Sequence, residues 1–309
     1  MNMESSKLAV ALEGVSKSYG SHRAVDSLSL SVPEGSIYGF IGPNGSGKTT
    51  TIRMILHILS ADEGRIEVLG ETDTRAANDQ IGYLPEERGL YKKMKVMKLL
   101  EYYASLKGLG RREAIAEGKR WLDRMELSDW ADKKIESLSK GMAQKVQFIA
   151  TALARPRLII LDEPFSGLDP VNLESIRTAI LDLRRQGSTI IFSTHDMGMA
   201  EKLCDSIFMI YKGKKVLDGT LDEIQSSYGK DTVRLSVDGG ASDLEGIPGI
   251  EKVIDMGKYL EVKWRGDGNE LLSSLMSRTR VRLFEETRPS LHDIFNRIAK
   301  STEGADSHE

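Results

Sequence analysis

Residues 42–49 carry the glycine, lysine and threonine spacing that predicts a phosphate-binding loop. They read Gly-Pro-Asn-Gly-Ser-Gly-Lys-Thr and fit the pattern G-x-x-x-x-G-K-[ST]. An apolar run at residues 36–41 precedes the loop, and a helix-like run at residues 50–59 follows it. The glycines allow a tight backbone whose N–H groups point at phosphate oxygens, and the helix adds its positive end. We expect Lys48 to reach the β- and γ-phosphates and Thr49 to ligate Mg²⁺.

A glycine-rich turn without a ligand is the alternative, so groups elsewhere in the chain must decide. The apolar run at residues 158–161 ends in Asp162 and Glu163, which predicts a buried parallel strand with two carboxylates at its carboxyl end. Such a pair can also cap a helix, but burying two charges beside aliphatic side chains favours a bound cation. We expect Asp162 to hold Mg²⁺, through water or Thr49, and Glu163 to polarise an attacking water.

A second buried strand, at residues 188–194, delivers His195 to the same edge of the sheet. A histidine there is either structural or a donor to a γ-phosphate oxygen. Ser139 precedes a helix and suits its N-cap; with the Gly141 backbone it could instead bind the γ-phosphate of a nucleotide held by another subunit. Asp169 ends a tight turn and is expected to cap the next helix.

Two more candidates lie in turns and loops. Tyr19, in the turn after the predicted first strand, is expected to stack on an adenine ring, with ordinary packing as the alternative. Glu86 follows a proline that interrupts a strand-like segment, where a carboxylate could approach the metal and the γ-phosphate. A solvated acidic loop is the alternative for Glu86.

The elements that must position these groups follow from the residue patterns. β-forming residues at 8–15, 24–32, 36–41 and 65–69 predict a small antiparallel sheet beside the phosphate loop, and helical patterns occupy 96–106 and 111–127. Beyond Gly219, predicted strands at 232–237, 259–264 and 281–285 alternate with predicted helices near 269–277 and 289–300. The last helix is expected to bury Leu291, Ile294, Phe295 and Ile298, and this region contains no catalytic constellation.

Composition limits the class of protein. The chain has 309 residues, enough for about two domains, and 40% hydrophobic residues. It contains no run approaching the ~18 apolar residues that span a bilayer, so we expect a soluble, unexported protein. The single cysteine, Cys204, excludes an internal disulfide, fits a cytosolic setting and is expected to be a core residue on a helix. A net charge of −3 gives no global basic surface, and no nucleic-acid partner is expected.

Five segments together resemble an ABC-type ATPase in their order and spacing. They are the phosphate loop and residues 138–141, 161–164, 166–169 and 194–196. The resemblance covers about residues 7–220. The sequence of residues 85–91 resembles the corresponding sequence of the NatA-like sodium and drug exporter ATPases. Two motifs depart from the family pattern: Glu86 stands where a glutamine is usual, and Lys140 and Met142 modify the usual LSGGQ signature.

The resemblance implies an α/β P-loop fold: a RecA-like core, an antiparallel β subdomain and a helical subdomain at about residues 88–155. It implies a nucleotide-binding domain at residues 1–220 and a small α+β accessory domain at residues 221–309. The residues expected to contact ATP are Tyr19, Gly42, Asn44, Gly45, Ser46, Gly47, Lys48, Thr49, Thr50, Ser139, Gly141 and Asp169. The expected catalytic residues are Lys48, Glu163 and His195, and the expected Mg²⁺ ligands are Thr49, Asp162 and Glu86.

The implied function is ATP hydrolysis in a transporter subunit, expected to be an exporter. One phosphate loop and one signature per chain imply a head-to-tail pair with a second copy or a homologous ATPase, with two ATP–Mg between the chains. A separate permease then holds the subunit at the cytoplasmic face of the membrane. The alternative is a non-transport ABC ATPase that acts on ribosomes or nucleic acid, although such proteins carry tandem cassettes, coiled coils or zinc motifs that this chain lacks.

Overall fold

The computed structural model describes residues 7–87, 89–228 and 232–306, and their side chains except those of 74–76 and 300–306. The chain divides into two compact units, residues 1–220 and residues 221–309, which are described separately. Within the described residues, no helix has the length and apolar character needed to cross a bilayer.

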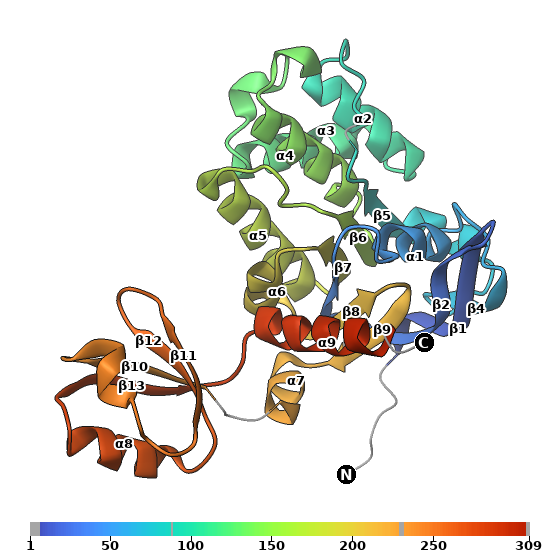
Figure 1. Cartoon of the computed structure of the whole chain (residues 1–309). Helices are drawn as coiled ribbons and strands as arrows, with labels where there is room; N and C mark the ends of the chain where they lie inside the picture. Colours follow the sequence, from blue (N-terminus) through green and yellow to red (C-terminus); the bar gives the residue numbers. More distant parts are fainter. Residues whose placement is uncertain (1–6, 88, 229–231, 307–309) are drawn as a thin grey trace, which may run out of the picture. The chain divides into compact units, whose positions relative to one another are not determined.

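A six-stranded sheet forms the centre of the first unit (Figure 1). Its order is β5 (Ile81–Leu84), β6 (Leu158–Asp162), β7 (Thr189–Thr194), β3 (Ile37–Ile41), β8 (Ser206–Tyr211) and β9 (Lys214–Gly219). The first five strands run parallel, and β9 pairs antiparallel with β8. Every residue of β3, β6 and β7 is buried, which fits the apolar runs that make up most of these strands.

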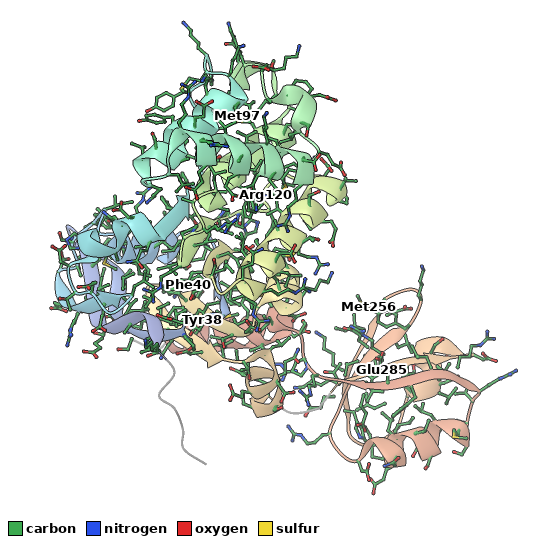
Figure 2. The ribbon with its side chains drawn as sticks, turned by 180° about the vertical axis from the view of Figure 1, so that it is seen from behind. Tyr38, Phe40, Met97, Arg120, Met256 and Glu285 are labelled. Atoms are coloured by element: carbon green, nitrogen blue, oxygen red, sulfur yellow. The ribbon has the colours of Figure 1, made fainter. Side chains whose placement is uncertain are left out.

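A separate three-stranded antiparallel sheet has the order β2 (His22–Pro33), β1 (Leu8–Tyr19) and β4 (Glu63–Val68). The prediction that residues 36–41 belong to this sheet is wrong, because β3 pairs with β7 and β8 in the six-stranded sheet. The side chains of β3, among them Tyr38 and Phe40, are buried on both faces of the sheet; Figure 2 labels these two residues. A strand buried on both faces belongs in the middle of a parallel sheet and not in a half-exposed antiparallel one.

Three helices, α2 (Val96–Leu106), α3 (Arg111–Arg124) and α4 (Lys140–Ala152), gather at one end of the first unit (Figure 1). In the hydrophobic core that these helices share, the rings of Trp121 and Phe148 pack edge to face, with 6.0 Å between the ring centroids. The other helices of this unit are α1 (Lys48–Ile55), α5 (Pro170–Arg185) and α6 (Met197–Leu203), and short 3-10 helices occupy Thr74–Gln80, Ser128–Trp130 and Ile135–Ser137.

The second unit contains a four-stranded antiparallel sheet with the order β11 (Ile250–Asp255), β12 (Leu260–Trp264), β10 (Thr232–Val237) and β13 (Val281–Thr287). Its helices are α7 (Leu221–Ser227), α8 (Gly268–Met276) and α9 (Leu291–Asp306), with a 3-10 helix at Gly240–Leu244. Leu271 and Leu275 of α8 join the core of this sheet. On α9, Leu291 and Ile294 are buried as predicted, whereas Phe295 and Ile298 are half-buried.

Several predicted boundaries need correction. Helix α1 begins at Lys48 and ends at Ile55, before the predicted end at 59, and α3 ends at Arg124. Tyr19 is the last residue of β1 and not a turn residue, because the β1–β2 pairing continues to Tyr19 opposite His22. Cys204 follows α6 as its C-cap instead of lying within it, and burial raises the pKa of its thiol, as expected for an inert structural cysteine.

Candidate functional site

The phosphate loop lies between β3 and α1, and its glycines are required by its shape. Gly47 has φ +111°, and a Cβ there would lie 2.6 Å from the carbonyl oxygen of Ala24. A Cβ on Gly42 would collide with the carbonyl oxygen of Ile210. Since α1 begins at Lys48, the first N–H groups of the helix have no partner within the helix and are available at the loop.

Lys48 is 6% exposed, and its ammonium folds back over the loop. Nζ donates to the carbonyl oxygens of Gly42 at 2.7 Å and Pro43 at 3.1 Å. Burial lowers the pKa of Lys48, and the attraction of nearby carboxylates, above all Glu163, acts in the opposite direction. A buried ammonium whose hydrogen bonds go to two loop carbonyl groups is suited to an incoming phosphate.

Asp162 ends β6 and is 1% exposed. Its Oδ1 accepts a short hydrogen bond from the Ser193 hydroxyl of β7. Its Oδ2 is buried and, among the residues that the structure describes, has no hydrogen-bond partner. A buried carboxylate oxygen without a partner is costly, and a divalent cation would satisfy it. The residues present therefore fit a Mg²⁺ ion.

Glu163 follows directly and adopts a left-handed backbone conformation with φ +49°. Its amide N–H donates to the Ser193 hydroxyl at 3.1 Å, so one serine fixes both acidic residues. Its Oε1 lies 2.9 Å from Nδ1 of His195, which follows β7. Glu163 is 8% exposed, whereas the His195 side chain is 59% exposed. This arrangement places a buried carboxylate and a solvent-accessible imidazole in direct contact.

A cavity of about 380 Å³ lies in front of the loop. Most of the predicted residues line it: Tyr19, Asn44, Gly45, Gly47, Lys48, Thr49, Thr50, Glu86, Asp162 and Glu163. We call it the nucleotide cavity. An exposed aromatic ring, a phosphate loop and acidic residues on one cavity match the base, phosphates and cation of a nucleotide.

Other predicted residues lie outside this cavity. Ser139 accepts a hydrogen bond from the amide of Met142 at 3.3 Å and caps α4, and Asp169 accepts from Val171 and Asn172 and caps α5. Gly141, on α4, also does not line the nucleotide cavity of its own chain. Ser46 is buried behind the loop, and its hydroxyl has no partner among the described residues. Ser139 and Gly141 are thus absent from the nucleotide cavity of the chain that carries them.

A neighbouring cavity of about 410 Å³ is lined by both charged residues that depart from the family pattern, Glu86 and Lys140. It shares Glu86, Asp162 and Glu163 with the nucleotide cavity. The Lys140 ammonium lies over the turn of residues 166–168, where a Cβ on Gly167 would be 2.5 Å from it.

Sequence reasoning missed three residues of the site. Ser193 was not singled out, although a serine that follows the apolar run Ile190–Phe192 and lies two residues before His195 is an available signal. His22 and Ala24 of β2 also line the nucleotide cavity. They lie across the hairpin from Tyr19, so only the strand register brings them there.

The fold and the site define a P-loop nucleoside triphosphatase. Family models agree: residues 25–166 match the model described as "ABC transporter", and residues 219–299 match "ATP-binding protein DrrA1-3-like, C-terminal domain". The chain is 45% identical, over 93% of its length and 97% of the relative's, to the uncharacterized ABC transporter ATP-binding protein YhaQ of Bacillus subtilis. It is 33% identical to the Nod factor export ATP-binding protein I of Sinorhizobium fredii over 96% of this chain and 88% of the relative.

A solved structure of the ATP-binding subunit of an ABC transporter has 30% identity and a TM-score of 0.68, covering 72% of this chain and 94% of that one. The chain therefore belongs to the ABC transporter ATP-binding proteins. It is an ATP-binding subunit with ATPase activity coupled to transport, and such subunits work with separate permease components. The predicted fold and activity are confirmed, and these relatives give no support to a ribosomal or nucleic-acid role.

Proposed function

We propose that this chain powers an exporter as one of a head-to-tail pair of ATPases. Relatives named for daunorubicin resistance, at 33% identity over 73% of this chain, and for Nod factor export support the outward direction. The observation that carries the pairing is the position of Ser139 and Gly141, which do not line the nucleotide cavity of their own chain. A second chain would bring its α4 N-terminus, with N–H groups suited to a γ-phosphate, to this cavity.

In this proposal each residue acts through the geometry described above. Tyr19, which is 48% exposed, stacks on adenine, and Lys48 exchanges its carbonyl partners for phosphate oxygens. Glu163 accepts a proton from the attacking water, and His195 positions Glu163 and donates to a γ-phosphate oxygen. Asp169 acts by fixing the start of α5 beside the paired chain.

Mg²⁺ would be held by Thr49, Asp162 and Glu86, all of which line the nucleotide cavity. When bound, the ion neutralises phosphate charge. Ser193 keeps Oδ1 of Asp162 occupied, so Oδ2 is the oxygen directed to the ion. The chain's own contribution is thus a carboxylate already oriented before the nucleotide arrives.

The permease is proposed to dock on an apolar groove of about 490 Å³ between β5, α2 and α4. Ile58 and Leu106 on this groove are each 57% exposed, and with the other apolar residues that line the groove they form an exposed apolar surface suited to a protein partner. Docking there would keep residues 1–220, the proposed nucleotide-binding domain with its helical subdomain at about 88–155, at the cytoplasmic face of the membrane. Residues 221–309 are proposed as an accessory domain.

The pairing is tested by measuring the mass of Glu163→Gln protein in solution with and without ATP and Mg²⁺. We expect a dimer only with nucleotide, and Ser139→Arg in the same background should prevent it. A Glu163→Gln protein that binds ATP but stays monomeric would refute the pairing.

The groove is tested by Leu106→Glu, which should weaken co-purification with a co-expressed permease partner while leaving the ATPase activity of the isolated chain unchanged. Met276→Glu, at an apolar position of the second unit that is 68% exposed, is the control. Equal co-purification of both variants would remove the groove from the permease interface.

A further inference from the structure

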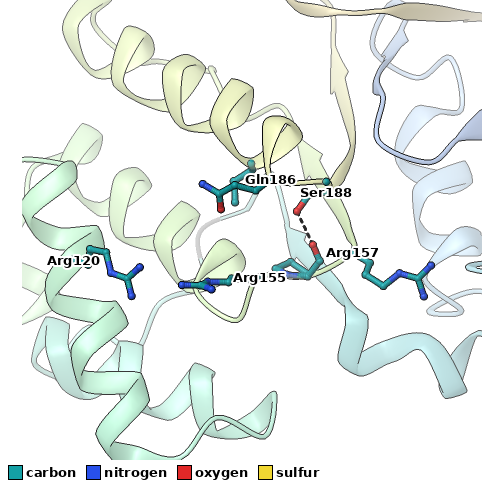
Figure 3. Close-up of a pocket in the computed structure, with 8 residues that line it drawn as sticks. Arg120, Arg155, Arg157, Gln186 and Ser188 are labelled. Carbon is teal, nitrogen blue, oxygen red and sulfur yellow. Dashed lines mark hydrogen bonds between the residues drawn. The ribbon is translucent and has the colours of Figure 1, made fainter.

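A third cavity, of about 480 Å³, lies between α3 and the connections that lead into β6 and β7. Its lining includes Arg120, Arg155, Gln186 and Ser188 (Figure 3). These connections precede the strands, so the cavity lies at the amino ends of β6 and β7, whereas Asp162 and the phosphate loop lie at the carboxyl edge of the sheet. Among the described residues, it shares no lining residue with the nucleotide cavity.

Two guanidinium groups face one another across this cavity. Figure 3 shows Arg120 reaching from α3 and Arg155 reaching from the α4–β6 connection, whereas Arg157 points away from them. Arg157 is engaged elsewhere, with Glu34 at 2.8 Å and Gln80 at 3.0 Å. The cation pair that faces the cavity is therefore Arg120 and Arg155.

Both arginines bind one oxygen of a single buried carboxylate. Nη2 of Arg155 lies 2.8 Å from Oε1 of Glu117, and Arg120 forms a shorter contact with the same atom. Glu117 is 7% exposed, whereas both arginine side chains are 63% exposed. One buried negative charge thus fixes two guanidinium groups and leaves an excess positive charge on the side that faces solvent.

A second shared carboxylate adds to this excess. Asp182 of α5 binds both Arg124 and Arg185, the latter at 2.8 Å. Arg124 lines a smaller cavity of about 120 Å³ that also contains Arg120 and Arg155. The two adjoining cavities are lined by four arginines, Arg120, Arg124, Arg155 and Arg157, and by one carboxylate, Glu117, so the charge of their lining is positive in a chain whose net charge is −3.

The backbone at Arg155 is strained. Its φ is +50°, a left-handed conformation that costs roughly 1 kcal/mol for a residue with a Cβ. The adjoining connection is held by Ser188, whose hydroxyl donates to the carbonyl oxygen of Pro156 at 2.8 Å. The two connections are therefore held together next to Arg155, and the contact with Glu117 orients its guanidinium group.

We propose that this cavity binds a small polyanion that carries two or more phosphate groups. The free edges of fixed guanidinium groups suit phosphate oxygens, which they bind in pairs, and Gln186 adds an amide donor. A volume of about 480 Å³ lies within the range of roughly 300–1,000 Å³ that small-molecule sites occupy. Because α3 and the β-strand connections contribute separate walls, the ligand would cross-link the helical group to the sheet.

Inorganic tripolyphosphate is the probe, measured by calorimetric titration of full-length protein. Lys48→Ala serves as the background because the nucleotide cavity would also take this anion. We expect one remaining site, weakened about tenfold or more by either Arg120→Gln or Arg155→Gln, the loss of a charge-assisted hydrogen bond. Arg112→Gln, an exposed arginine on the same helix, should leave the affinity unchanged.

Thermal unfolding supplies a second readout. Tripolyphosphate should raise the melting temperature of the Lys48→Ala protein and of its Arg112→Gln derivative, but not that of the Arg120→Gln derivative. Arg120→Gln leaves Arg155 paired with Glu117, so this variant keeps a partner for the buried carboxylate. Absence of binding in the Lys48→Ala background, or equal binding by Arg120→Gln and Arg112→Gln, would overturn the proposal.

The phosphate groups belong either to a free anion or to a lipid headgroup, and vesicles containing cardiolipin, whose headgroup carries two phosphate groups, distinguish these sources. If Arg155→Gln reduces sedimentation with such vesicles, the headgroup is the ligand. If sedimentation is unchanged while tripolyphosphate binding is lost, the ligand is a free polyanion.

Discussion

Nδ1 of His195 lies 2.9 Å from Oε1 of Glu163, and this contact joins the ends of two neighbouring parallel strands. The carboxylate is buried while the imidazole is largely exposed, so the histidine is positioned to contact both Glu163 and a ligand that enters from solvent. The distance depends on strand register, because Asp162 of β6 pairs with Ser193 of β7.

Glu163→Gln should bind ATP normally and hydrolyse it about 100-fold or more slowly, because an amide cannot accept the proton of the attacking water. Nucleotide binding by fluorescence and phosphate release measure the two steps separately. Hydrolysis by this variant at the wild-type rate would remove Glu163 from the role of general base.

Lys48→Ala should abolish hydrolysis, with a loss of about 100-fold or more, because the only ammonium that contacts the loop carbonyls among the described residues is removed. Unlike Glu163→Gln, this variant should also bind ATP weakly. Lys17→Ala, a half-buried lysine on β1 that forms an ion pair with Asp62, is the control. Tight ATP binding by Lys48→Ala would contradict its proposed contact with the phosphates.

Glu86→Gln should remain active but require more Mg²⁺, because a carboxylate at this position adds negative charge beside the ion that a neutral amide does not. The measurement is the ATPase rate against Mg²⁺ concentration. Glu87→Gln is the matched control, since Glu87 lines the neighbouring cavity but not the nucleotide cavity. Identical titrations for wild type and Glu86→Gln would exclude Glu86 from the metal site.

Lys140 and Glu86 should be energetically coupled, because an ammonium and an additional carboxylate line the same cavity. Lys140→Gln should lower the ATPase rate in the wild-type background and lower it less in the Glu86→Gln background, a non-additivity of about twofold or more. Lys133→Gln, another exposed lysine of the same unit, tests for a general charge effect. Additive effects would mean that the two departures from the family pattern act independently.

Truncation after Gly219 should leave the nucleotide cavity intact, because all its lining residues lie in the first unit. If residues 221–309 pair with their counterpart, the ATPase rate of the truncated protein should depend more steeply on protein concentration. The competing hypothesis is that the apolar face of α9 serves only as internal core. Superimposable concentration curves for full-length and truncated protein would favour this competing hypothesis.

The buried strands and the loop were predictable because their chemistry is local. The four aliphatic residues before Asp162 predict a strand whichever strands it pairs with. The spacing of the loop residues predicts a turn and the start of a helix. Pairing is not local: the five apolar residues of β3 have the same pattern in either sheet, and only contact with β7 settles which one they join.

Exposed elements were harder to predict. The edge strand β11 was missed because its residues are half-buried or exposed, and its register with β12 shifts after Ile250, which breaks the alternation that identifies a strand. Interactions that join distant segments of the chain were also missed. The hydrogen bond of Ser193 to Asp162 spans 31 residues, and the contacts of Arg155 and Arg120 with Glu117 require the folded helix α3.

Because of the left-handed conformation of Glu163, the thermal stability of the chain and its catalytic rate make opposite demands on this one residue. Glycine would adopt φ +49° with roughly 1 kcal/mol less strain and would remove a buried carboxylate. A selection for variants of this chain with higher thermal stability would therefore favour substitutions at Glu163. The selected proteins would be stable but catalytically inactive.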